Sequence, residues 1–243
     1  MSIKKLSAAL ILTFTTAAAA DYRTEIKAAY FDSDKQESTA LAGKFHFRPV
    51  ETASHPLAEA AFLERSSNIS LSHTRNEFGP TNTDTTVAVV ALYIPQAMLY
   101  IAPIYVRASS KLYDYSASQS EWGVAVGITP IEGFRLSTTY ADEVDYETNF
   151  EIKYLLSFAN NTAINMEFGY ADASTPYMSD TISRAVDFYF DRTFNVGIEM
   201  ISKGTTTHAI STEKFFTETF SGYASYRKGY NDEGWIIGAS MRF

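Results

Sequence analysis

The chain has 243 residues, of which 46% are hydrophobic, 14% aromatic and 20% charged, so it can fold around apolar surface and is not charged enough to be disordered. It has no cysteine, which excludes a disulfide scaffold, a thiolate metal site and a cysteine nucleophile. Its formal net charge of −8 would repel phosphate backbones, so nucleic acid is not expected as a partner.

The first twenty residues are typical of a secretory signal peptide. Two lysines precede a short apolar run, Leu6 to Phe14, and the segment ends in a row of alanines before Asp21. The apolar run is well short of the roughly 20 residues that a membrane-spanning helix needs. We therefore expect residues 1–20 to be removed on export and residues 21–243 to form the mature protein.

Most of the mature chain alternates between apolar and polar side chains, with the period of two that a β-strand produces. The clearest case starts at Tyr146, where Phe150 and Ile152 share one face while Glu151 and Lys153 share the other. The uncharged run of residues 87–106 could be taken for a spanning helix. Its prolines and its valine, isoleucine and tyrosine content indicate two strands joined by a tight turn instead.

Aromatic residues recur near the ends of the apolar faces, with smaller aliphatic residues more often between them. Examples are Tyr22 with Tyr30, Phe45 with Phe47, and Trp235 with Phe243. This pattern is typical of strands that cross a membrane, with aromatic girdles at its two interfaces. A soluble sandwich also has two-faced strands, but its aromatic residues have no reason to gather at the strand ends. We therefore favour a closed barrel, which pairs every backbone group inside lipid.

The sequence predicts an all-β protein, an antiparallel transmembrane β-barrel of about fourteen strands within a range of roughly twelve to sixteen. The predicted strands are residues 22–31, 38–48, 67–75, 84–95, 98–109, 121–130, 133–141, 146–157, 162–171, 182–190, 194–201, 206–216, 220–228 and 234–243. The register of residues 84–109 and 206–216 stays open, because both faces of these segments carry apolar side chains.

The connections alternate between tight and long. Tight turns are predicted at residues 96–97, 131–132, 158–161, 191–193 and 217–219, and longer polar loops at residues 76–83, 110–120 and 172–181. In bacterial barrels the short turns face the periplasm and the long loops face the outside. An even strand count then puts both chain ends in the periplasm.

Residues 49–66, between the second and third predicted strands, depart from the alternating pattern. Pro56 precedes an alanine-rich stretch that ends at Leu63, which predicts a two-turn helix with proline in its first turn. Because two strands precede it and the chain is expected to start in the periplasm, this connector should also be periplasmic. We favour a connector that shields the rim of the barrel, and a plug or docking element remains the alternative.

Four short segments carry a resemblance to a known family. They are Ala20-Asp21-Tyr22, Phe47-x-Pro49, the run from Pro56 to Leu63 followed by Arg65 and Ser67-Asn68, and the terminal run from Gly238 to Phe243. The first three resemble the putative general porin family of gammaproteobacterial outer membranes, and the last resembles the usual end of outer-membrane barrels. The resemblance implies a channel in the outer membrane of a Gram-negative bacterium. It implies no ligand and no active residues.

No catalytic motif accompanies the four histidines, His46, His55, His73 and His208. An outer-membrane hydrolase would need one of them to meet a serine or an aspartate, and we favour solvated or rim positions instead. The acidic segments 142–145 and 231–233 lack the fixed ligand spacing of a cation site. We therefore expect no enzymatic activity, no cofactor and no metal.

The predicted function is passive diffusion of small hydrophilic solutes or ions through the barrel, with a non-conducting adhesin or scaffold as the alternative. Charged residues on polar faces would line the pore and set its selectivity. The candidates are Arg23, Glu25, Lys27, Lys44, Arg48, Arg107, Arg135, Glu147, Glu151, Lys153, Glu167, Asp187, Glu199 and Arg242. The expected partners are outer-membrane lipid, the solutes, and the assembly machinery that would read the terminal Phe243; a homo-oligomer is left open.

Overall fold

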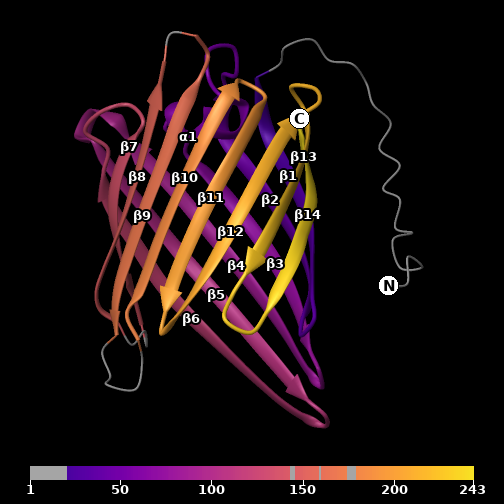
Figure 1. Ribbon diagram of the computed structural model, residues 1–243. Coiled ribbons are helices and arrows are strands. Elements are labelled where there is room, and N and C mark those ends of the chain that lie inside the picture. Colours follow the sequence, from indigo (N-terminus) through magenta and orange to yellow (C-terminus); the bar gives the residue numbers. More distant parts are fainter. Residues whose placement is uncertain (1–20, 143–145, 159, 174–178) are drawn as a thin grey trace.

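The computed structural model describes residues 21–142, 146–158, 160–173 and 179–243, without the side chains of residues 146 and 147. The described residues form fourteen antiparallel strands, each hydrogen-bonded to the next, and β1 pairs with β14 to close the ring (Figure 1). The prediction of a fourteen-stranded antiparallel barrel is confirmed. The predicted signal peptide, residues 1–20, lies outside the described residues.

The strands agree with the predicted segments in number and order. They are β1 (Tyr22–Ser33), β2 (Glu37–Val50), β3 (Asn68–Phe78), β4 (Thr81–Ile94), β5 (Leu99–Leu112), β6 (Tyr115–Ile128), β7 (Phe134–Ala141), β8 (Tyr146–Ser157), β9 (Ala163–Ala173), β10 (Thr181–Asp191), β11 (Phe194–Lys203), β12 (Thr205–Phe215), β13 (Phe220–Lys228) and β14 (Glu233–Arg242). Between β2 and β3 lie the 3-10 turn η2 (Leu57–Glu59) and the helix α1 (Ala60–Leu63), where a short helix was predicted, and η3 (Pro95–Ala97) joins β4 to β5. None of the helices in the described ranges is long and apolar enough to cross a membrane.

Alternation along each strand separates an apolar outer face from an inner face. Ile198 on β11 opposes Ile210 on β12, and both are outward, with exposed fractions of 61% and 53%. Their neighbours Glu199 and Ala209 oppose each other on the inner face. The outer surface is therefore apolar, as lipid contact requires.

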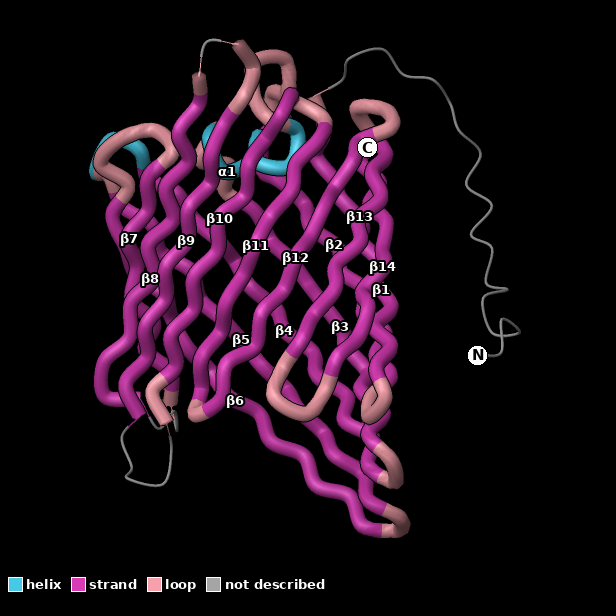
Figure 2. The backbone as a smooth tube through the Cα atoms, viewed as in Figure 1, coloured by secondary structure: helices cyan, strands magenta, loops and turns pink. Residues whose placement is uncertain are grey.

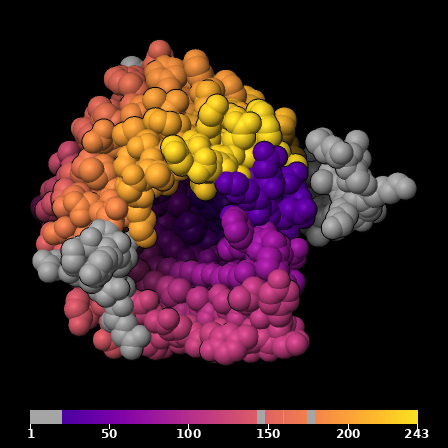
Figure 3. Space-filling model, turned by 60° about the horizontal axis from the view of Figure 1, so that its bottom comes forward, coloured from indigo at the N-terminus to yellow at the C-terminus, as the bar shows by residue number. Residues whose placement is uncertain are grey.

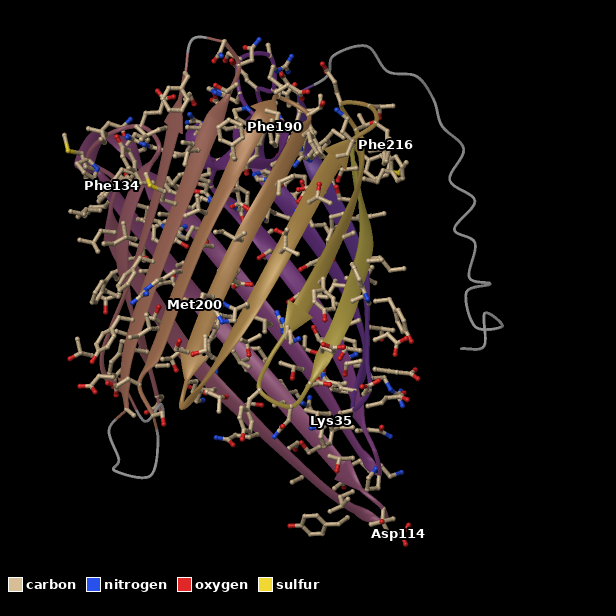
Figure 4. The ribbon with its side chains drawn as sticks, viewed as in Figure 1. Lys35, Asp114, Phe134, Phe190, Met200 and Phe216 are labelled. Atoms are coloured by element: carbon tan, nitrogen blue, oxygen red, sulfur yellow. The ribbon has the colours of Figure 1, made fainter. Side chains whose placement is uncertain are left out.

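Two aromatic belts bound this apolar surface. We call the end at which β1 begins and β14 ends the terminus end, and the opposite end the far end. Figure 4 labels Phe134, Phe190 and Phe216 toward the terminus end. Toward the far end, the tilted rings of Tyr105 and Trp122 are in contact with centroids 4.7 Å apart, and those of Tyr226 and Trp235 with centroids 4.8 Å apart. This is the arrangement of rings at two membrane interfaces.

One residue assigned to these belts lies inside the barrel instead. Tyr22 is only 2% exposed, and its ring meets the ring of His46 edge-on with centroids 5.5 Å apart. The register between β1 and β2 shifts between Tyr22 and Thr24. Such an irregularity turns a side chain to the other face, which a strict period of two cannot anticipate.

Two of the three predicted long loops are wrong. β5 and β6 stay paired up to Leu112 opposite Tyr115, and β3 and β4 up to Phe78 opposite Thr81, so two-residue turns replace the loops at 110–120 and 76–83. The β5–β6 hairpin projects at the far end, with Asp114 at its tip (Figures 1 and 4). Serine and threonine made these segments look like loops, yet they pair well as strands. The third loop, predicted at 172–181, contains residues 174–178, which lie outside the described residues.

The turns that were predicted to be tight lie at the terminus end, together with the connector between β2 and β3, although short turns such as that between β11 and β12 also occur at the far end. There β4 passes to β5 through η3, and β10 passes to β11 through two residues, Arg192 and Thr193. Figure 2 shows the short helices at this end of the barrel. The connector is therefore placed to act on one mouth of the channel.

Candidate functional site

Residues 51–67, which join β2 to β3, fold into the barrel; we call this segment the plug. Leu57 and Ala60 in the plug are 1% and 0% exposed, and both contact inner-wall residues rather than the outside of the rim. The predicted short helical connector is present, and it packs against the inner wall at the terminus end, as the plug alternative describes. Sequence alone could not decide this, because packing against the inner wall fixes the direction in which a connector folds.

The plug crosses the lumen from one wall to the opposite one. Ala60 packs against Tyr22 of β1, and Leu63 packs in a cluster with Leu155 of β8 and Tyr189 of β10. In a closed ring of fourteen strands, β1 and β8 stand seven strands apart in either direction and so face each other. The plug therefore spans the channel near its terminus end.

A carboxylate in the plug is held by the wall formed by β8 to β10. Lys153 places its Nζ 2.9 Å from Oε2 and 3.0 Å from Oε1 of Glu59, and the hydroxyl of Tyr189 donates to Oε1 of Glu59 at 3.0 Å. The same Nζ lies 2.8 Å from Glu167 of β9. Charge-assisted bonds of this kind are shorter and stronger than neutral ones. Glu59 therefore ties the middle of the plug to the β8–β10 wall.

On the opposite wall, the penultimate residue of the chain holds the plug backbone. Arg242 donates from Nε to Oε2 of Glu25 at 2.6 Å and from Nη1 to the carbonyl oxygen of Leu57 at 2.8 Å. Its guanidinium also lies between two rings, 4.5 Å from the centroid of Tyr22 and 4.6 Å from that of Phe215. Each contact satisfies part of a buried cation. Arg242 thus bonds both β1, the strand that closes the barrel against β14, and the backbone of the plug.

The two ends of the plug are also fixed. Arg192, in the β10–β11 turn, donates to the carbonyl oxygens of Thr52 and His55, and its own carbonyl oxygen accepts from the backbone N–H of Leu57 at 2.7 Å. At the other end, Nδ1 of His46 lies 2.8 Å from the hydroxyl of Ser66. The position of the plug is therefore set by polar contacts at its two ends and its middle.

Most predicted pore-lining candidates occupy the inner face in the strand register. These are Glu25, Lys27, Lys44, Arg135, Glu151, Lys153, Glu167, Asp187, Glu199 and Arg242. The structure groups Glu25 with Lys27 and Arg242, groups Lys153 with Glu167, and brings Arg135 within 4.0 Å of Glu151. In the second group Asn165 bridges Glu167 and Asp187, donating at 3.0 Å to each.

The remaining candidates lie elsewhere. Arg23 is exposed beside the shift in the β1 register, and Arg48 is exposed at the terminus end, although it alternates with the inward Lys44 and His46. Arg107 is exposed and shares the outer face of β5 with Tyr105, so it does not line the lumen. Both faces of its segment carry apolar residues, so its register could not be chosen from the sequence. The side chain of Glu147 lies outside what the structure describes.

Sequence reasoning missed the residues that hold the plug. Glu59, Tyr189, Arg192 and His46 were not among the candidates, although each contacts the plug or belongs to it. A signal for Glu59 was present, because it is a lone carboxylate among the apolar residues of a short helix. Glu213 and Arg227 were missed as well; the register places both on the inner face, opposite Tyr223 and Ala209.

The far half of the lumen is hollow. A cavity of about 610 Å³ lies among β1, β2, β3 and the strands β11 to β14, and its lining includes Phe31, Asn76, Tyr223 and Arg227. Viewed from the far end, the space-filling surface is hollowed between the strands (Figure 3). The geometry is that of a channel open toward its far end and crossed by the plug near its terminus end. Within the described ranges no cluster of metal-ligating side chains is found.

Comparison with known proteins identifies the class of channel. The family model described as "Putative general bacterial porin" matches residues 3–129, which is more than half of the chain. The chain belongs to this family. By family the protein is therefore an outer-membrane porin. Porins are a class of channels rather than of enzymes. No curated protein matches it by sequence.

Solved structures share the fold of this porin. The outer membrane protein Omp33 of Acinetobacter baumannii aligns with a TM-score of 0.76 at 20% identity, covering 93% of this chain and 100% of that one. The KdgM porin in complex with disordered oligogalacturonate aligns with a TM-score of 0.50 at 11% identity, covering 90% of this chain and 99% of that one. At these identities the likeness concerns the fold alone.

Proposed function

We propose that this porin lets small hydrophilic solutes and ions diffuse passively across the outer membrane, and that the plug controls when the lumen is open. The observation that carries the proposal is the plug itself, a chain segment that crosses the lumen and is held from opposite walls by Lys153 and Arg242. A barrel that served only as a scaffold would require neither a lumen with a hollow far half nor a separate closing element.

The contacts of the plug suit a closure that can be released. Several of them are single hydrogen bonds and ion pairs, and a hydrogen bond to a charged group contributes about 1.5–3 kcal/mol net, a small amount beside the pairing of the whole barrel wall. The apolar contacts of Ala60 and Leu63 are few and belong to two small clusters. Opening then requires the plug to swing on its junctions with β2 and β3 while the barrel wall stays paired.

The proposal includes the orientation and the route of export. Residues 1–20 act as the export signal, the terminus end with the plug faces the periplasm, and the far end with the β5–β6 hairpin faces the outside. Inner-face charges such as Glu199 and Lys27 set ion preference. No catalytic role and no cofactor belong to this proposal.

The deciding experiment is a recording from the full-length protein, purified from outer membranes in detergent and inserted into planar lipid bilayers. We expect stepwise currents with long closed periods, and swelling of protein-containing liposomes in small sugars. A folded barrel that gives no current and no swelling, both as the native chain and after release of the plug by Glu59→Gln, would favour the scaffold instead.

A further inference from the structure

Two neighbouring strands of the inner wall, β4 and β5, carry a continuous apolar stretch. We call the following inner-face residues of β4 and β5 the apolar strip: Val87, Val89, Ala91, Ala102, Ile104 and Val106. Their orientation follows from the register, because Lys44 of β2 opposes Ser70 of β3, Ser70 opposes Val89, and Val89 opposes Ile104. A strip of this kind is unexpected in a water-filled pore, where inward side chains are polar.

Within the described residues, the hydrophobic cluster that includes four residues of the strip draws its members from β4, β5 and β6 alone. It comprises Ala91, Tyr100, Ala102 and Ala125, with Val89, Tyr93 and Ile104 packed against them. The plug and the opposite wall contribute no member to it. Val87, Val89, Ile104 and Val106 are half-buried rather than covered. The strip therefore presents apolar surface to the lumen, and covering that surface is favourable.

The wall that faces the strip carries charges of both signs. In the closed ring β12 stands seven strands from β5, so β11 to β13 form the opposite wall. On this wall Glu199 of β11 and Arg227 of β13 point into the lumen. Both pair with Ala209 of β12, which lies between them. The structure gives no ion pair for either side chain within the ranges it describes. Arg227 also lines the cavity of about 610 Å³ in the far half.

The charges and the strip lie at similar depth in the barrel. Ile104 lies five residues after the start of β5, and Glu199 lies five residues after the start of β11. Val106 and Arg227 each lie seven residues after the start of their strands. All of these strands start at the terminus end, and the rise per residue is the same in each. A solute in the lumen would thus meet an apolar surface on one flank and a carboxylate with a guanidinium on the other.

We propose that the lumen favours small zwitterionic solutes with an apolar side, the class of the apolar amino acids, over polar solutes of the same size. The ammonium group of such a solute faces Glu199, its carboxylate faces Arg227, and its side chain lies along the apolar strip. A purely cationic or purely anionic amphiphile would satisfy only one of the two charges. This inference rests on the proposed function, because it concerns what diffuses through the same lumen.

The test compares leucine with asparagine, whose side chains branch at the same carbon and differ mainly in polarity. Entry of each labelled amino acid into liposomes that contain the full-length protein is measured, in the native chain and in the Glu59→Gln background. We expect leucine to enter faster than asparagine. In the double variant Ile104→Thr with Val106→Thr, the leucine-to-asparagine ratio should fall at least about threefold, because polar groups replace apolar surface beside the solute. Threonine keeps the β-branched shape that suits a strand.

Two controls make the test specific. Ile236→Thr changes an inner-face aliphatic residue of β14 that lines the cavity away from the strip, and it should lower the ratio less than the strip variant does. Arg227→Gln should slow leucine more than it slows an uncharged sugar. Val89→Thr provides a second strip variant if the double variant fails to fold. Folding is checked by comparing the gel mobility of unheated and heated samples, which differs for a folded barrel.

The outcomes separate the two proposals. Equal entry of leucine and asparagine through the native channel, or an unchanged ratio in folded strip variants, overturns the selectivity while diffusion of ions and sugars still stands. Absence of any current and any solute entry in every protein contradicts the proposed function and this inference with it.

Discussion

Lys153 of β8 and Glu59 of the plug lie 2.9 Å apart between Nζ and Oε2, with side chains only 17% and 10% exposed. The wall residue keeps a second carboxylate, Glu167 of β9, at 2.8 Å. Lys153 is therefore compensated whether or not the plug is in place. The plug can therefore move away without leaving Lys153 as an unpaired charge in the wall.

Glu59→Gln should increase the fraction of time that the channel is open. The substitution weakens the bond to Lys153 while Glu167 still neutralises that lysine, so the barrel should fold normally. A loss of about 1 kcal/mol corresponds to a roughly fivefold change in the open-to-closed ratio. Single-channel recording measures it. Glu64→Gln is the matched control, because Glu64 bonds His55 inside the plug at 2.8 Å and not the wall; an equal effect of both variants would argue against the role of Glu59.

A reversible cross-link between plug and wall should close the channel. Leu63 of the plug and Ala163 of β9 belong to one buried cluster, and the chain has no native cysteine. We expect Leu63→Cys with Ala163→Cys, joined by a short cross-linker that reductant can cleave, to abolish the stepwise currents until reductant is added. Each single variant treated in the same way should keep its currents. Undiminished current in the fully cross-linked protein would mean that ions pass elsewhere than through the lumen.

Arg242→Ala should destabilise the barrel far more than an equivalent change at Arg227. Removing Arg242 leaves Glu25 without its closest partner at a site where both side chains are nearly buried, 2% and 6% exposed. Breaking a buried pair in this way typically costs about 3–5 kcal/mol. Urea unfolding of the two variants in detergent micelles measures the difference. A double variant, Glu25→Gln with Arg242→Met, should recover part of the loss, and equal stability of the two alanine variants would contradict the prediction.

Labelling on whole cells tests the proposed orientation. Ser116 lies on the projecting β5–β6 hairpin at the far end, and Asn160 lies in the β8–β9 turn at the terminus end. Ser116→Cys should react with a membrane-impermeant thiol reagent, whereas Asn160→Cys should react only after the cells are opened. Labelling of Asn160→Cys on intact cells would reverse the orientation and put the plug on the outer side.

Changes at Phe243 should affect assembly rather than conductance. Its carbonyl oxygen accepts from the backbone N–H groups of Arg23 and Thr24 at 2.7 and 3.0 Å, while its ring is 57% exposed. Phe243→Ala keeps the backbone bonds and should lower the amount of folded barrel in the outer membrane, since the ring is the part that assembly machinery would read. Deleting Phe243 should lower it further. Normal amounts of the alanine variant would show that the ring carries no signal.

Alternation along the chain was enough to predict the closed barrel and its strand count, because a period of two is a local property that each strand carries alone. The short helix was predicted from Pro56 and the alanine-rich stretch after it, which are local signals as well. It failed where two strands had to be placed relative to each other. The register of residues 84–109 could not be read, and Arg107 was assigned to the lumen although it lies outside. Tyr22 was assigned to the outer belt because a shift in pairing leaves no mark in the sequence.

The candidate site was predicted less completely than the fold. The charged inner-face residues follow from alternation, so Glu25, Lys153 and Arg242 were found. Their roles depend on Glu59, which reaches them only because the connector turns inward, a consequence of packing that involves β1, β8 and β10 together. A segment whose position is decided by long-range contacts cannot be placed from its own residues.

The plug remains joined to β2 and β3 at both of its ends, so opening never releases it into solution. Its return is a unimolecular step governed by an effective concentration that a short tether holds high, on the order of millimolar for flexible linkers. Reclosure should therefore be independent of protein concentration and fast. Openings would be brief under any condition that leaves the bonds of Lys153 and Arg242 able to re-form.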